Sequence, residues 1–168
     1  MTFYKWILVV LVTSASICAL NGCTDRCSDA CEQNGSCNGK FCDCEPGYMG
    51  QQCELRAAAQ LAGTYTVVAI RSNLDTVLNQ STITANPNDI TEMYINDLHG
   101  IGPVTCTFEP LYKEMRYLTF YFSSQALGTT DTVSGDGSYN DEKDQIYIEY
   151  DLTDSLGRQE WRATFTRL

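Results

Sequence analysis

Short segments in which apolar and polar residues alternate cover most of the chain after residue 62. Because successive side chains of a β-strand point to opposite faces of a sheet, alternation of this kind predicts strands that are solvated on one side. The pattern predicts eight strands, at residues 64–70, 81–85, 92–95, 104–108, 117–122, 130–134, 145–151 and 161–167. The second part of the chain is therefore expected to be mainly β.

Clusters of turn-forming residues separate several of these segments. We predict turns at Asn86-Pro87-Asn88-Asp89, at His99-Gly100-Ile101-Gly102-Pro103 and at Gly135-Asp136-Gly137. No segment between the strands has the periodicity of a long helix, so the strands are expected to pair antiparallel. Residues 63–168 are predicted to form one domain, an antiparallel eight-stranded β-barrel or a sandwich.

The alternation also assigns the faces of three predicted strands. The core-facing residues are Leu118, Phe120 and Phe122 on one strand, Ile146, Ile148 and Tyr150 on the next, and Trp161, Ala163 and Phe165 on the last. The solvent-facing residues between them are Thr119, Glu149, Arg162, Thr164 and Thr166. This division is typical of a sheet that covers a core with one face.

The first residues of the chain have the pattern of an export signal. Lys5 precedes an apolar stretch, residues 6–20, which is shorter than the roughly 20 residues that a membrane-spanning helix needs. Residues 1–22 are therefore predicted to be a signal peptide. The sequence Leu20-Asn21-Gly22-Cys23 resembles the lipobox of bacterial lipoproteins, which implies acylation of Cys23 and a tether at residues 23–26. Ordinary secretory cleavage near Ala19 or Gly22 is the alternative.

Six of the nine cysteines lie between residues 27 and 53, which favours an oxidising compartment outside the cytoplasm. Six cysteines allow fifteen pairings, so their spacing alone does not choose among them. The C-x-C pair at Cys42 and Cys44, followed by Gly47-Tyr48-Met49-Gly50 and Cys53, is similar to the EGF-like pattern. That resemblance makes residues 27–53 an EGF-like module and implies the disulfides Cys27–Cys37, Cys31–Cys42 and Cys44–Cys53. Neither a zinc site nor a calcium site is expected in this module.

Composition limits the classes of partner. The chain has 21 acidic residues against 11 lysines and arginines and a formal net charge of −10. Such a surface repels phosphate backbones and anionic lipid headgroups, so nucleic acid is not an expected partner. We expect attachment to a membrane through the acyl group on Cys23, with a protein or a glycan at the cell surface as the further partner.

Residues 54–62, which are rich in alanine, are predicted to form a linker or a short helix. The domain that follows opens with Leu61-Ala62-Gly63-Thr64-Tyr65 and carries a later Val133-Ser134-Gly135-Asp136-Gly137 element and an Ile-x-Ile-x-Tyr strand. Behind a lipobox and an EGF-like module, these features resemble uncharacterised lipoproteins of the Bacteroidetes type. The resemblance implies a lipocalin-like, or calycin-like, β-barrel.

Few residues have a pattern that indicates chemistry. His99 is the single histidine and lies in a predicted turn without a nucleophile-elbow sequence nearby. Cys106 alternates with apolar residues, so we expect a buried, inert thiol, with a disulfide to an unacylated Cys23 as the alternative. The acidic residues Asp136, Asp141, Glu142 and Asp144 lack the spacing of a calcium loop and are expected at a solvated hairpin tip.

Two further patterns concern binding and modification. Six tyrosines are candidates to line a ligand mouth, namely Tyr94, Tyr112, Tyr117, Tyr121, Tyr139 and Tyr147. Three tripeptides, Asp75-Thr76-Val77, Asp131-Thr132-Val133 and Asp154-Ser155-Leu156, look like the Asp-Ser/Thr-apolar sites of O-glycosylation in such bacteria.

The sequence thus favours an exported lipoprotein, anchored to the outer membrane or cell surface of a bacterium, that acts as a binding or adhesion module. We expect no enzymatic activity and no cofactor. The alternative is a lipocalin-like carrier of a small apolar ligand. A carrier must leave a cavity inside the barrel, whereas a binding module fills the barrel with side chains.

Overall fold

The structure, a computed structural model, describes residues 31, 34–39, 41–72, 75–98, 100, 102–111, 117–128 and 130–168. The predicted signal peptide, the predicted acylation site Cys23, and also Cys27, His99 and Tyr112 lie outside the described residues. Within the described part, no helix is long and apolar enough to cross a membrane.

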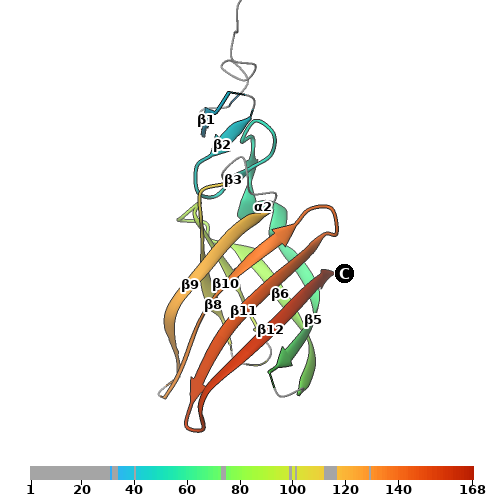
Figure 1. Cartoon of the computed structure of the whole chain (residues 1–168), viewed down its shortest axis with the longest axis vertical. Coiled ribbons are helices and arrows are strands. Elements are labelled where there is room, and N and C mark those ends of the chain that lie inside the picture. The colour runs from blue at the N-terminus through green and yellow to red at the C-terminus, as the bar shows by residue number, and fades with distance from the viewer. Residues whose placement is uncertain are drawn as a thin grey trace, which may run out of the picture.

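A small cysteine-rich unit precedes the barrel (Figure 1). Its strands β1 (Gly35–Cys37) and β2 (Cys42–Cys44) form a hairpin, and β3 (Tyr48–Met49) pairs with β4 (Leu55–Arg56). Two of the implied disulfides are present, Cys31–Cys42 and Cys44–Cys53. Cys37 is also disulfide-bonded. These covalent links replace the core that about 30 residues cannot build.

The predicted eight-stranded antiparallel barrel is confirmed. Its strands, in the order of the closed barrel, are β10 (Asp131–Asn140), β11 (Gln145–Asp154), β12 (Gly157–Arg167), β5 (Gly63–Arg71), β6 (Thr76–Ala85), β7 (Glu92–Ile95), β8 (Val104–Phe108) and β9 (Leu118–Leu127). Strands β7 and β8 have the bounds that the sequence predicts, and the other six are longer than predicted. We call the barrel end with the β5–β6, β9–β10 and β11–β12 hairpins the distal end, because it lies opposite the cysteine-rich unit (Figure 1).

The prediction of a turn at residues 135–137 is wrong, because these residues lie within β10. A Cβ atom on Gly135 would lie 2.3 Å from the carbonyl oxygen of Glu149 and 2.8 Å from Cζ of Phe122. A Cβ atom on Gly137 would lie 2.4 Å from Cζ of Phe120. The glycines therefore make room for large side chains in the core rather than for a turn in the backbone.

Side chains fill the barrel interior in the described part of the chain. The core-facing residues assigned from the sequence on β9, β11 and β12 are all buried, and Tyr65, Met93 and Phe108 join them with 0–2% exposure. Rings meet edge to face in two pairs, Tyr65 with Phe165 and Phe108 with Phe120. Close packing of this kind leaves the interior without the space that a carrier needs.

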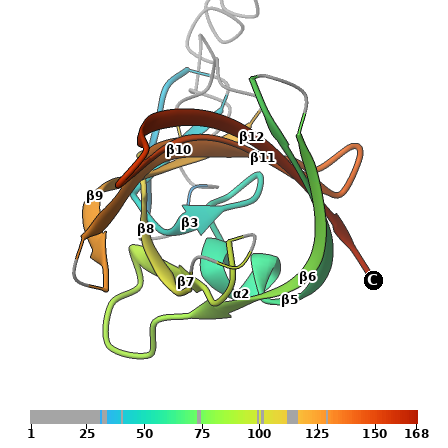
Figure 2. The same ribbon diagram turned by 90° about the horizontal axis from the view of Figure 1, so that it is seen from below.

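Helix α2 (Ala57–Leu61) lies within the segment predicted as a linker or short helix, and it closes one end of the barrel. Seen along the barrel in Figure 2, α2 lies inside the ring of strands. Its residues Ala57, Ala58 and Leu61 are buried in the same core as the barrel side chains. The apolar face of a helix only five residues long is thus stabilised by tertiary packing, since so short a helix does not form alone.

The cysteine-rich unit packs directly against the barrel. The backbone of Cys44 pairs with that of Leu111 through two hydrogen bonds, with N···O distances of 3.0 and 3.1 Å. Gly47 has a φ of +86°, and a Cβ at this position would lie 2.3 Å from the carbonyl oxygen of Ile90. A turn glycine at this position therefore allows the unit to approach the loop between β6 and β7 closely.

Candidate functional site

A surface hollow of about 600 Å³ lies on the outer face of the barrel over β5, β10, β11 and β12. We call it the outer groove. A second hollow of about 330 Å³ shares Arg71, Ser72, Arg158 and Glu160 with it. Arg158 and Glu160 lie in the half of β12 next to the β11–β12 turn, so this part of the groove lies toward the distal end.

The register of four strands places one row of outward side chains across the groove. Asp136 lies opposite Glu149, Glu149 opposite Arg162, and Arg162 opposite Ile70. Nε of Arg162 lies 3.0 Å from Oε1 of Glu149, and both side chains are largely exposed, at 81% and 67%. The row therefore offers two carboxylates, one guanidinium and one apolar side chain to a partner.

A second row lies one step closer to the distal end. Asp151 lies opposite Glu160, and Nη2 of Arg158 lies 2.7 Å from Oδ2 of Asp151. The hydrogen bond to Asp151 and the charge of that carboxylate raise the pKa of Arg158. Like charges directly opposite each other on a sheet are unfavourable, so the neighbouring carboxylates in the two rows favour a partner that brings positive charge.

Two aromatic residues of the strands that carry the groove face the core, behind the outward rows. The rings of Tyr150 and Trp161 stack with an interplanar angle of 9° and a centroid distance of 6.3 Å. The guanidinium of Arg71 lies 5.8 Å from the centroid of the Trp161 ring. Burial raises the pKa of Tyr150. The core side of the sheet behind the charged rows is therefore apolar and well packed.

This arrangement presents charged groups that can pair with those of a partner. The lining residues of the groove supply charged, apolar and hydrogen-bonding groups but no cysteine or histidine. Among the described residues no group of three or more His, Cys, Asp or Glu side chains is placed to hold a metal ion. Both carboxylates and guanidinium groups face solvent, where they can pair with charges of a partner.

The acidic residues assigned to one hairpin tip do not lie together. Asp141, Glu142 and Asp144 form the turn between β10 and β11, but Asp136 lies within β10 and lines the outer groove. Asp144 is engaged on the protein itself: it pairs with Arg167 at 3.3 Å and accepts a hydrogen bond from the Tyr139 hydroxyl at 3.1 Å. The prediction of a single solvated tip is therefore wrong for Asp136.

The tyrosines do not line a common mouth. Tyr117 and Tyr121 are exposed on the outside, and Tyr147 is half-buried on the outward face of β11. Tyr139 instead packs against the core and contacts Asp144. Tyr94 lies half-buried on β7.

Cys106 is a free thiol with 0% exposure, located between Val104 and Phe108 on the core side of β8. Burial raises its pKa. The structure thus contains the free, buried thiol expected from the alternation, and Cys23, its alternative partner, lies outside the described residues.

All three Asp-Ser/Thr-apolar tripeptides lie at the distal end. Thr76 begins β6, Thr132 lies near the start of β10, and Ser155 lies in the turn between β11 and β12. Thr76 and Ser155 are exposed, and Thr132 is half-buried. The three tripeptides lie at one end because each is at a hairpin on the same side of an up-and-down barrel. Their grouping could not be predicted without the strand topology.

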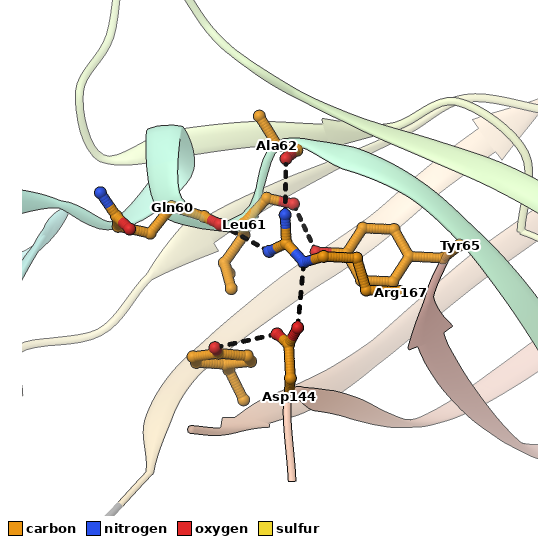
Figure 3. Close-up of polar contacts among 7 residues, drawn as sticks. Gln60, Leu61, Ala62, Tyr65, Asp144 and Arg167 are labelled. Atoms are coloured by element: carbon orange, nitrogen blue, oxygen red, sulfur yellow. Dashed lines mark hydrogen bonds and ion pairs between the residues drawn. The ribbon is translucent and has the colours of Figure 1, made fainter. Parts of the chain in front are cut away.

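A polar cluster that the sequence did not reveal ties α2 to the barrel (Figure 3). Arg167 donates hydrogen bonds to the carbonyl oxygens of Gln60 (2.6 Å) and Ala62 (3.1 Å), and its guanidinium lies 5.2 Å from the ring centroid of Tyr65. The Tyr65 hydroxyl donates to the carbonyl oxygen of Leu61 at 2.7 Å.

Burial and nearby charges both change the pKa values of the phenols in this cluster, Tyr65 and Tyr139. Burial raises the pKa of Tyr65 to about 12, although the charge of Arg167 acts in the opposite direction. Burial and the hydrogen bond to Asp144 raise the pKa of Tyr139. The cluster is a structural clamp on α2, because its polar groups bond to the chain itself.

No protein-family model and no curated protein matches the chain. Two solved structures are similar to it over the barrel. One is the structure of EF1p2_mFAP2b bound to DFHBI, with 16% identity, a TM-score of 0.41, and coverage of 66% of this chain and 97% of that one. The other is a redesigned β-barrel with 20% identity, a TM-score of 0.39, and coverage of 68% of this chain and 97% of that one.

Proposed function

We propose that this protein is a lipid-anchored lipoprotein of the bacterial cell envelope that acts as a non-catalytic binding or adhesion module, with the outer groove as its binding surface. The observation that carries this proposal is a contrast between two places in the barrel. Side chains fill the interior, whereas the outer face has an open groove of about 600 Å³ that is crossed by two rows of charged side chains.

The position of the groove supports an anchored role. The predicted acylation site Cys23 precedes the cysteine-rich unit in sequence, and that unit lies at the end of the barrel opposite the distal hairpins (Figure 1). Strand β11 has 10 residues, which spans about 33 Å at roughly 3.3 Å per residue. An EGF-like base on a membrane would therefore hold the distal part of the groove well above the lipid surface.

The two disulfides of the structure support the EGF-like interpretation of this base, and disulfides in general support an exported protein. The filled interior favours the binding module over the lipocalin-like carrier. If this protein binds an apolar probe such as 1-anilinonaphthalene-8-sulfonate and a fatty acid displaces the probe, that result would favour the carrier hypothesis instead.

The anchor is tested by the intact mass of the protein from the membrane fraction of its own host, before and after reduction and alkylation. We expect a diacyl or triacyl adduct on Cys23, three disulfides and one free thiol on Cys106. A lipid-free chain recovered only in the soluble fraction would contradict the anchor and leave the binding groove to be tested separately.

The groove is tested by binding of the labelled, lipid-free chain to whole cells of the host and to glycans extracted from their surface. The double variant Asp136→Asn with Glu160→Gln removes two groove carboxylates, and the control Glu109→Gln with Glu142→Gln removes two exposed carboxylates elsewhere. We expect about tenfold weaker binding for the first variant and unchanged binding for the second, since a few residues dominate most interfaces. Equal binding by both variants would contradict the assignment of the groove.

Binding also has an intrinsic reporter. The chain has two tryptophans, Trp6 in the predicted signal peptide and Trp161 on the core side of β12, next to the groove. After cleavage, Trp161 is the single tryptophan, so a partner that occupies the groove is expected to change its emission. A screen against chromogenic esters and glycosides is expected to show no turnover.

A further inference from the structure

The inner face of strand β6 carries two polar side chains, Asn79 and Ser81. Because successive residues of a strand face opposite sides of the sheet, both lie on the same face as Ile83, which is 1% exposed and belongs to the barrel core. Ser81 is 2% exposed, and Asn79 is half-buried. These two residues therefore place polar atoms among the apolar side chains that fill the barrel.

One oxygen atom of each side chain has no hydrogen-bond partner in the described part of the chain. Oδ1 of Asn79 and Oγ of Ser81 are both buried, and neither bonds to another group of the protein. The amide of Asn79 makes one long contact, 3.5 Å from its Nδ2 to the carbonyl oxygen of Gln80. Native proteins rarely leave a buried polar atom unpaired, because the loss of its bonds to solvent is then not offset.

The cross-strand neighbours on β5 do not supply these hydrogen bonds. Ser81 lies opposite Tyr65, and Asn79 lies opposite Val67. The Tyr65 hydroxyl donates to the carbonyl oxygen of Leu61 at 2.7 Å, and the side chain of Val67 has no polar atom. A partner for both oxygens therefore has to come from outside the chain.

The spacing of the two residues fits a molecule of the size of water. Residues i and i+2 on one face of a strand lie about 6.6 Å apart, at roughly 3.3 Å per residue. A water molecule that bonds two oxygens at ~2.8 Å each spans up to about 5.6 Å, so a small lean of the side chains toward each other brings both within reach. Asn79 lies nearer the distal end than Ser81 and is half-buried, which gives a water molecule a route from solvent.

We propose that Asn79 and Ser81 bind an ordered water molecule between them, inside the barrel on the inner face of β6. The Ser81 hydroxyl donates to the water, and the water donates to Oδ1 of Asn79, so that one molecule pairs both oxygens. This is the lower end of the roughly 2–4 hydrogen bonds that a buried water makes. The inference is independent of the outer groove and of the acyl anchor, because it depends only on the inner face of β6.

The first test is a crystal structure of the full chain with Cys23→Ser, which removes the predicted acylation site, at a resolution that shows ordered water. We expect one water molecule within about 3.2 Å of both Oδ1 of Asn79 and Oγ of Ser81. A water bound to only one of the two side chains would overturn the proposal. So would side chains that bond directly to the protein, or a larger molecule in this place.

The second test asks whether the two residues share one water. Asn79→Leu and Ser81→Ala each remove one of its two partners, and the double variant removes both. If the first substitution releases the water, the second should shift the urea midpoint much less than it does alone, or in the opposite direction. The comparison cancels the apolar contribution of the new leucine, because that contribution is present with or without Ser81.

The matched control combines Asn79→Leu with Thr119→Val. Oγ1 of Thr119 is also buried and unpaired, but Thr119 lies on β9, which does not pair with β6. We expect the two midpoint shifts of the control pair to add, since distant sites act independently. Additive shifts in the Asn79 and Ser81 pair as well would contradict a shared water. Asn79→Ala takes the place of Asn79→Leu if the leucine variant does not fold.

Discussion

Arg167 is expected to stabilise the protein more than any other arginine of the described chain that pairs on the surface. It joins the last strand of the barrel to the helix that closes one end, through two hydrogen bonds to carbonyl oxygens of residues 60 and 62. It also lies against the Tyr65 ring and pairs with Asp144. We propose Arg167→Met as the perturbation, because methionine keeps much of the apolar stem and loses every polar contact.

The magnitude follows from these contacts. Hydrogen bonds to a charged group are worth about 1.5–3 kcal/mol each, at the lower end for partly exposed acceptors such as these. The cation–π contact adds about 0.5–1 kcal/mol, and the ion pair with the half-exposed Asp144 adds less than about 1 kcal/mol. Because such contributions are not additive, we expect Arg167→Met to lower the free energy of unfolding by about 2–4 kcal/mol.

The matched control is Arg162→Met, the same substitution on the same strand. Arg162 pairs with Glu149, but both side chains are largely exposed, so the loss should be about 0.5 kcal/mol or less. Urea denaturation followed by far-ultraviolet circular dichroism measures both values, and hydrogen exchange should show faster exchange in α2 for the Arg167 variant alone. Equal, small losses for the two variants would refute the view that Arg167 clamps α2 to the barrel.

Four other outcomes follow from the structure. Gly135→Ala should lower the free energy of unfolding by about 1–3 kcal/mol in thermal or urea denaturation, because the new Cβ would lie 2.3 Å from the carbonyl oxygen of Glu149. Gln125→Ala should cost about 1–3 kcal/mol and speed amide exchange in β8, whose backbone the Gln125 amide bonds at 2.6 and 2.9 Å. Tyr65 has a pKa raised from 10.0 to about 12, so its contribution is complete below pH 10 and lost as pH rises toward 12, and Tyr65→Phe should flatten the fall in stability over that window. Cys106, with a pKa raised by burial, should resist alkylation in the folded protein and react once the protein is unfolded.

The alternation of apolar and polar residues was sufficient to predict the barrel because its strands are solvated on one side. On β12, Trp161, Ala163 and Phe165 face the core and Arg162 faces solvent, as the pattern predicts. Strands were predicted too short where the alternation includes glycine or polar residues. In β10, glycines occupy positions where a side chain would collide with Phe120 or Phe122. The sequence alone does not distinguish a glycine that makes room for a neighbouring side chain from a glycine that allows a turn.

The residues that line the candidate groove could not be predicted from the sequence, for a physical reason. Asp136, Glu149, Arg162 and Ile70 are far apart in sequence and become one row only through the register of four strands. Register depends on turn lengths and on the bulge in the β9–β10 ladder between residues 133 and 135. Alternation fixes which face a side chain takes, but not which neighbours it meets there.

The contacts between the cysteine-rich unit and the barrel decide whether an anchor on the unit would also fix the orientation of the barrel. A flexible linker would let the barrel take any orientation, so that the position of the groove relative to a membrane would have no meaning. Here the backbones of Cys44 and Leu111 are hydrogen-bonded, Gly47 lies against the loop that contains Ile90, and α2 is buried in the barrel core immediately after the unit. Each of these contacts uses backbone or core atoms rather than mobile surface side chains. The unit and the barrel therefore move as one body, and a base held at the lipid surface would keep the distal hairpins pointed away from it.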